Sequence, residues 1–241
     1  MELKICHMYP DVLNLYGDRG NIICMQKRLA WRGIDALITK LPIGERASLA
    51  DFDLVFIGGG QDFEQEVLLD DLHRGKDREI KSAIEDGVTF LTICGGYQMM
   101  GNYYETYDRH RCDFIGAVDL YTLGLKNRMI GNYKYKCTES AGGSVVVGFE
   151  NHSGKTYLGA GVEPLGHVLA GFGNNGEDGT EGVHYKNLFG TYSHGPLLPK
   201  NAELCDFILQ TALERKYGAA ELAPLDDAAE TAAHDAMCAK L

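Results

Sequence analysis

The feature that most constrains the fold is a short apolar run that ends in a cysteine followed by two glycines. Residues 88–93 (V-T-F-L-T-I) are mostly β-branched or aromatic and few enough for a buried strand, and residues 97–100 begin an apolar spacing suited to a helix. Cys94 lies between them, and Gly95 and Gly96 lack the Cβ atoms that would clash in a tight turn. This order predicts a thiol lifted off the carboxyl edge of a sheet toward helix N–H groups that favour a thiolate. The alternative is a buried structural cysteine at a strand end.

The first half of the chain alternates strand-length apolar runs with segments of helical spacing. Asn21 is a plausible N-cap for the first helix, and Gly33 is its expected C′ residue. Alternation at these lengths predicts parallel βαβ units, with ligands beyond the carboxyl ends of the strands. The predicted strands are residues 3–8, 36–41, 53–57 and 88–93, and the predicted helices are residues 22–32, 61–72 and 77–86.

The second half has more β-branched and aromatic alternation and many glycines. We therefore predict an α/β fold with a mostly parallel central sheet flanked by helices, and extra β-strands in the second half. We expect one domain over residues 1–217 and an alanine-rich, acidic tail or helix over residues 218–241. The further predicted strands are residues 115–120, 129–136, 144–149, 167–172 and 188–192, before a helix at residues 204–213.

Charge and cysteine usage restrict the class of partner. The chain has 241 residues and a net charge of −11, which argues against a nucleic acid or an anionic membrane surface as the main partner. Its N-terminus has no signal-peptide pattern and no apolar run is long enough to insert into a membrane, so we expect a cytoplasmic protein. The seven cysteines are irregularly spaced without a C-x-x-C pair, which indicates reduced thiols and no metal site.

A thiolate that expels an amine needs a proton donor, and the chain has eight histidines. His194 is the best candidate, because it closes a predicted strand at residues 188–192 and stands before Gly195 and Pro196. His152, in a polar turn after a strand, is the second choice. A solvated or structural role is expected for the others: His7, His73, His110, His167, His184 and His234.

Several motifs resemble those of a known family. T-I-C-G-G-Y-Q around Cys94 and the downstream S-H-G-P resemble class I glutamine amidotransferases of the cobyric acid synthase branch. The pattern D-x-L-N-L-Y-x-D-x-G-N-I near Asn14, F-I-G-G-G at Phe56, G-F-E-N-H at Gly148 and a long block over residues 173–201 are more similar to the GatD family. GatD proteins are the glutaminase subunits of lipid II isoglutaminyl synthases. The resemblance covers residues 3–217 and implies a flavodoxin-like fold.

The resemblance implies roles for the residues at the predicted sheet edge. Cys94 is the nucleophile that forms a γ-glutamyl thioester, and His194 is the acid and base. The N–H of Gly95, with one from Gly59 or Gly60, stabilises the tetrahedral oxyanion.

The resemblance also implies a substrate pocket for L-glutamine. Gln98 faces the substrate, and Asn151 and His152 line the same pocket. Arg128 holds the free α-carboxylate, to which an arginine fork is well suited.

A partner is implied as well. GatD-type glutaminases pair as heterodimers with a Mur-ligase-like subunit of the MurT type, on which ATP and Mg²⁺ are expected; no cofactor is expected on this chain. The ammonia is used to amidate the D-glutamate α-carboxyl of the lipid II stem peptide. Three alternatives stay open: another amidation such as that of a cobyrinate, a stand-alone cysteine amidase or γ-glutamyl hydrolase, and a catalytically inactive regulatory subunit.

One position departs from the wider class. Typical members have a glutamate two residues after the histidine, where this chain has Pro196. The carboxylate that orients His194 must therefore come from elsewhere, with Glu150 and Glu181 as local options. We expect the partner subunit to supply it.

Overall fold

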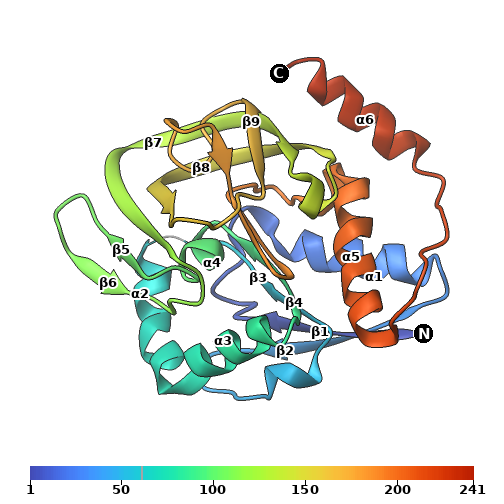
Figure 1. Ribbon diagram of the computed structural model, residues 1–241, viewed down its shortest axis with the longest axis horizontal. Coiled ribbons are helices and arrows are strands. Elements are labelled where there is room, and N and C mark those ends of the chain that lie inside the picture. Colours follow the sequence, from blue (N-terminus) through green and yellow to red (C-terminus); the bar gives the residue numbers. More distant parts are fainter. Residues whose placement is uncertain (61) are drawn as a thin grey trace.

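A mostly parallel six-stranded sheet forms the centre of the protein, as expected from the sequence (Figure 1). The computed structural model describes residues 1–60 and 62–241, and the side chains outside residues 61–66. The strand order is β11-β12-β4-β3-β1-β2, and every pairing except β11 with β12 is parallel. The strands are β1 (Glu2–Met8), β2 (Asp35–Leu41), β3 (Leu54–Ile57), β4 (Thr89–Ile93), β11 (Val183–Tyr185) and β12 (Leu188–Thr191).

Helices cover both faces of this sheet. Helices α1 (Arg19–Ala30) and α5 (Ala202–Tyr217) lie side by side, and α2 (Asp62–Asp71) and α3 (Asp77–Glu85) lie apart from them (Figure 1). Strands β3 and β4 consist of fully buried side chains, as expected for strands covered on both faces. The strand order reverses direction between β1 and β3, and ligands of open α/β sheets bind at such a switch point.

A second, mostly antiparallel sheet is built from the later part of the chain. Its long strands β7 and β8 form a hairpin whose register shifts between Gly124 and Met129. A bridge between Phe149 of β8 and His194 joins this sheet to the end of β12. The strands are β5 (Tyr103–Glu105), β6 (Arg111–Asp113), β7 (Leu120–Cys137), β8 (Val145–Leu158), β9 (Gly166–Ala170) and β10 (Thr180–Glu181).

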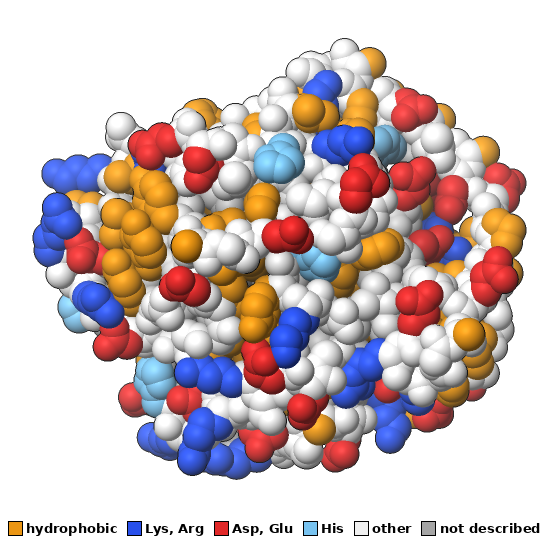
Figure 2. Space-filling view, in the orientation of Figure 1, with side chains coloured by type: hydrophobic (Ala, Val, Ile, Leu, Met, Phe, Trp, Pro, Cys, Tyr) orange, Lys and Arg blue, Asp and Glu red, His pale blue; other side chains and the backbone are white. Residues whose placement is uncertain are grey.

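Aromatic side chains cross the outer side of the second sheet. Tyr121 of β7 stacks on Tyr103 of β5 and on Tyr157 of β8, with ring centroids 5.3 and 5.4 Å apart. The Arg111 guanidinium lies over the Tyr103 ring, with its Cζ 3.8 Å from the ring centroid. Figure 2 shows an apolar stripe where these strands lie, on a face that otherwise mixes acidic and basic side chains. These cross-strand pairs stabilise the sheet.

Most predicted elements are confirmed, and three details were wrong. Residues 115–120 do not form a strand before Leu120. Asn21 lies inside α1, where its Oδ1 accepts the Leu198 N–H instead of capping the helix. The helix after Cys94 is shorter than predicted and consists only of α4 (Gly95–Gln98). Gly101 then packs closely on Leu120, since a Cβ on Gly101 would lie 2.2 Å from Leu120 Cδ1. The prediction for residue 61 lies outside the described residues.

The C-terminal segment crosses over α1 and α5 and ends in α6 (Ala228–Cys238), at the upper right of Figure 1. Arg28 of α1 anchors this segment, because its guanidinium donates to Asp206 of α5 and to Asp227 before α6, each at 2.7 Å. Lys134 of β7 donates to the Cys238 carbonyl at 2.9 Å. Among the described residues, no helix is both long and apolar enough to cross a membrane.

Candidate active site

Cys94 occupies a strained turn at the carboxyl end of β4. Its φ of 48° and ψ of −106° are unusual for a residue with a side chain, and such strain is typical of nucleophile elbows. The backbone is held from both sides, since the Cys94 N–H donates to Thr191 O and the Gln98 N–H donates to Cys94 O, both at 2.8 Å. Gly96 lets α4 pack against β3, because a Cβ there would lie 2.7 Å from Gly58 O. The thiol is thereby presented at the edge predicted from the sequence.

His194 lies beside Cys94 at the end of the neighbouring strand β12. Its backbone N–H donates to Phe149 O at 2.8 Å, so the second sheet fixes its position. The ring is fully buried and contacts Tyr16 edge to face, with centroids 4.9 Å apart. Gly59 shows how tightly the groups meet, because a Cβ there would lie 2.6 Å from His194 Cε1 and 3.3 Å from Cys94 Cβ.

The carboxylate beside His194 is Asp18, in the loop between β1 and α1. Asp18 Oδ1 lies 3.7 Å from His194 Nδ1, and both side chains are fully buried. Its other oxygen, Oδ2, accepts the Gly59 N–H at 2.6 Å, which fixes the carboxylate. Asp18 is therefore a carboxylate of this chain beside His194, and the expectation that the partner subunit supplies the orienting carboxylate stays a prediction. The sequence motif near Asn14 contains Asp18, but the sequence by itself did not indicate a role for this residue.

The two acids considered from the sequence are engaged elsewhere. Glu150 accepts the N–H groups of Phe172 and Gly173 at 2.8 and 3.0 Å. Glu181 Oε1 accepts from Thr191 Oγ1 and from the Tyr192 N–H at 2.7 and 2.8 Å, and burial raises the pKa of Glu181 to about 7. Both carboxylates hold the second sheet and its loops together.

The electrostatics favour a charged His194 ring. Burial by itself lowers the pKa of His194, but the adjacent Cys94 sulfur and the Asp18 carboxylate outweigh it and raise the pKa to about 10. At neutral pH the His194 imidazole is therefore protonated beside the Cys94 sulfur, a pairing that suits nucleophilic attack by sulfur. Such a pair attacks a carbonyl carbon and protonates the departing amine.

Gly59 and Gly60, the two predicted alternatives for an oxyanion donor in the turn after β3, have different contacts. The Gly59 N–H donates to Asp18, so Gly59 does not serve as the oxyanion donor expected from the sequence. Gly60 lines the cavity beside Cys94, and Gly95 is the first residue of α4, directly after Cys94. These two glycines remain the oxyanion donors consistent with the geometry.

A narrow cavity beside Cys94 gathers the predicted substrate-binding residues. Its volume of about 20 Å³ is that of a single water molecule, so glutamine binding requires the mouth to open. Gln98 is held by a 2.9 Å bond from its Nε2 to the Tyr192 hydroxyl. The lining residues are Leu15, Gly60, Cys94, Gln98, Arg128, Asn151, His152, Ser153 and Gly154.

Three hydrogen-bonded side chains lie at or next to this cavity. Exposed Arg128, from the irregular part of the β7–β8 hairpin, donates through Nε to Asn151 Oδ1 at 2.6 Å and through Nη2 to Asn151 O at 2.9 Å. Asn151 Nδ2 in turn donates to the Tyr16 hydroxyl. Because Tyr16 also contacts the His194 ring, these side chains link the β7–β8 hairpin to His194 after β12. Sequence reasoning did not single out Tyr16.

His152 lies in the wall of the cavity and is not positioned as the catalytic base. Its ring stacks on Tyr192 with centroids 3.6 Å apart, and Nδ1 lies 2.8 Å from Gly154 O. Nε2 lies 3.6 Å from Glu150 Oε2. Both ring nitrogens therefore face oxygen acceptors. In the part of the chain that the structure describes, no group of three or more His, Cys, Asp and Glu side chains is arranged to hold a metal ion.

Comparison with known proteins decides the family. Residues 4–202 match the CobB/CobQ-like glutamine amidotransferase domain. The chain belongs to this family. The chain is thus a glutamine amidotransferase, and its Cys–His–Asp site lies where a doubly wound sheet places its ligands.

Two relatives are similar over almost the whole chain. The lipid II isoglutaminyl synthase (glutamine-hydrolyzing) subunit GatD of Staphylococcus aureus is 44% identical over 236 residues, covering 98% of this chain and 95% of that protein. The protein of the same name from Streptococcus pneumoniae is 40% identical over 218 residues, covering 90% and 83%. A cobyric acid synthase of Listeria monocytogenes is 30% identical over 192 residues, covering 72% of this chain but 35% of that longer protein.

Solved structures agree on the fold. PurLQS from Thermotoga maritima is similar with a TM-score of 0.59 at 16% identity, covering 89% of this chain and 99% of that chain. A glutamine amidotransferase from Thermotoga maritima has a TM-score of 0.54 at 14% identity, covering 98% and 90%. The expected glutamine amidotransferase fold is therefore confirmed.

Proposed function

We propose that this chain is the glutaminase subunit of a lipid II isoglutaminyl synthase. The similarity to two proteins of that name over most of both lengths supports this assignment. The cobyrinate-type alternative is less favoured, because the match to a cobyric acid synthase spans only 35% of that enzyme. The single structural observation that carries the glutaminase chemistry is the buried contact of Asp18 with His194 beside Cys94.

The reaction begins when the Cys94 thiolate attacks the side-chain amide carbon of L-glutamine. The carbonyl oxygen becomes an oxyanion, which the N–H groups of Gly60 and Gly95 stabilise. The His194 imidazolium gives its proton to the amide nitrogen, the carbon–nitrogen bond breaks, and ammonia leaves. A γ-glutamyl thioester remains on Cys94.

Water then completes the cycle. Neutral His194 takes a proton from a water molecule that attacks the thioester, and the carbon–sulfur bond breaks to release glutamate and the Cys94 thiolate. Asp18 keeps Nδ1 of the ring protonated, so that the opposite nitrogen can exchange protons with sulfur, amine and water in turn.

The ammonia is passed to a second subunit. A Mur-ligase-like partner of the MurT type would hold ATP and Mg²⁺, activate the D-glutamate α-carboxyl of the lipid II stem peptide and form the amide. ATP-dependent chemistry on such a partner suggests a cytoplasmic heterodimer. The closed mouth of the cavity is consistent with an enzyme that opens only with substrate or partner in place.

Reconstitution tests this proposal. The chain is mixed with a MurT-type ligase, ATP, Mg²⁺, lipid II and glutamine labelled with ¹⁵N at the side-chain amide, and lipid II is analysed by mass spectrometry. We expect ¹⁵N in the amide formed at the stem-peptide glutamate. The Cys94→Ser chain should lose amidation from glutamine, while added ammonium should still support it. Transfer of label to a cobyrinate acceptor but not to lipid II would overturn the assignment.

Arg128→Ala should act mainly on glutamine affinity. The substitution removes a charge-assisted contact to the α-carboxylate, so we expect KM to rise by about tenfold to a hundredfold with a smaller change in kcat. Arg128→Lys should restore little, because lysine cannot form the fork. Steady-state glutaminase kinetics measure both parameters.

The matched control is Lys126→Ala on the same exposed hairpin, where the ammonium lies 5.4 Å from the Tyr107 ring centroid. It should leave KM unchanged. An unchanged KM in Arg128→Ala itself would show that the carboxylate is bound elsewhere.

A further inference from the structure

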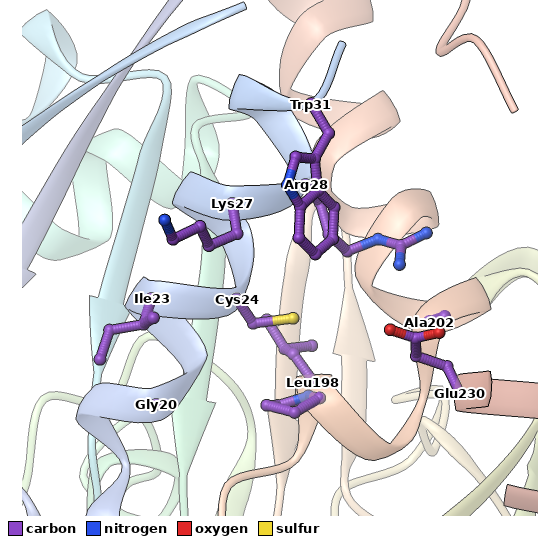
Figure 3. Close-up of a pocket in the computed structure, with 10 residues that line it drawn as sticks. Gly20, Ile23, Cys24, Lys27, Arg28, Trp31, Leu198, Ala202 and Glu230 are labelled. Atoms are coloured by element: carbon purple, nitrogen blue, oxygen red, sulfur yellow. The ribbon is translucent and has the colours of Figure 1, made fainter. Parts of the chain in front are cut away.

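A second cavity lies on the outer side of α1. It has a volume of about 310 Å³ and shares no lining residue with the cavity beside Cys94. Figure 3 shows the Cys24 sulfur pointing into it, with the Trp31 ring on one side, Leu198 on the other and the Glu230 carboxylate across the opening. Cys24 is partly exposed here, so a small reagent can reach its thiol.

A second thiol lies directly behind the first. The sulfur atoms of Cys24 in α1 and Cys205 in α5 are 3.9 Å apart, although the residues are 181 positions apart in the chain. Cys205 is fully buried, whereas Cys24 is partly exposed. None of the seven cysteines, all of which lie in the described part of the chain, is in a disulfide, and a disulfide here needs the Cys24 and Cys205 sulfurs to approach by about 2 Å.

The surroundings favour the thiolate at Cys24. The hydrogen bond with the Cys205 thiol lowers the pKa of Cys24; burial opposes this shift, and the nearby Arg28 guanidinium supports it. Burial instead raises the pKa values of Cys6 and Cys137 to about 12. Thiolate character together with access determines which cysteines oxidise.

We propose that Cys24 and Cys205 form a peroxide-sensitive thiol pair, in which Cys24 is oxidised and Cys205 resolves it. The Cys24 thiolate attacks one oxygen of hydrogen peroxide, the O–O bond breaks, and hydroxide leaves a sulfenic acid on Cys24. The Cys205 sulfur then attacks the Cys24 sulfur while the Cys205 thiol proton passes to the leaving hydroxyl, so the S–O bond breaks, water departs and the disulfide forms. Overall, two thiols and one hydrogen peroxide give one disulfide and two water molecules.

The bond would cross-link two elements near the catalytic site. Helix α1 begins directly after Asp18, and Gly20 packs so tightly on the loop after His194 that a Cβ would lie 2.4 Å from Pro196 Cγ. The oxidation chemistry itself is independent of the proposed glutaminase function, and it is read from peptides without an activity assay.

Peptide mapping of the intact chain tests the proposal. The reduced protein is treated with hydrogen peroxide, its remaining thiols are blocked, and it is digested without reductant. We expect the peptide containing Cys24 joined to the peptide containing Cys205, two hydrogen atoms lighter than the two reduced peptides together, and separated again by dithiothreitol. In Cys205→Ala, dimedone should label Cys24 as the trapped sulfenic acid.

Cys238 is the matched control, because it is also partly exposed but burial raises its pKa. It should react more slowly with peroxide than Cys24. If Cys205→Ala folds poorly, the rates at which iodoacetamide alkylates Cys24 and Cys238 in the unmodified chain at neutral pH provide the comparison instead. Absence of the cross-linked peptide, or a Cys24 that alkylates no faster than Cys238, would overturn the proposal.

Discussion

Replacing Cys94 with serine should lower the rate of glutamine hydrolysis by about a thousandfold or more, because a hydroxyl is a far weaker nucleophile than a thiolate. The fold should persist, since the substitution exchanges one small side chain for another at a site held by backbone bonds to Thr191 and Gln98. Glutamate release measures the activity, and circular dichroism checks the fold.

A glutamine-mimicking electrophile provides a second measurement of the same residue. It should label Cys94 in the unmodified chain and leave Cys94→Ser unlabelled. The control Cys112→Ser changes a half-exposed thiol on β6 and should retain both activity and labelling. Labelling that persists in Cys94→Ser would refute the assignment of the nucleophile.

Asp18→Asn should lower kcat by on the order of a hundredfold to ten-thousandfold with little change in KM. The amide cannot stabilise the His194 imidazolium, and it can hold the ring in the wrong tautomer. Asp18 raises the pKa of His194, so its loss should lower that pKa, and the alkaline limb of the kcat/KM profile should move to lower pH. A merely structural role for Asp18 would change stability without moving this limb.

The same variant separates two origins of the carboxylate. If Asp18 completes the triad, the defect persists when the ligase subunit is added. If the partner supplies the carboxylate, activity of Asp18→Asn returns in the complex. Asp11→Asn is the control, because it removes the same charge from an exposed position in the same loop and should leave kcat unchanged.

The sequence predicted the central sheet because its signals are local. Buried strands such as β3 and β4 are continuous apolar runs of strand length, and helices with apolar spacing separate them. The second sheet was harder to predict. Short strands such as β5 and β10 have too few residues to show a period, and pairing with distant strands determines where they begin and end.

For the site, the sequence by itself identified Cys94 and His194, because a strand end followed by glycines is visible in a few neighbouring residues. Only the tertiary structure placed Asp18 against His194, since no pattern relates residues that far apart and the deciding contact is a 2.6 Å bond from the Gly59 N–H, in the turn after β3. The same holds for the hydrogen-bonded chain of Arg128, Asn151 and Tyr16. Local sequence sets where a strand stops, whereas packing of β1, β3, β4 and β12 decides which side chains meet there.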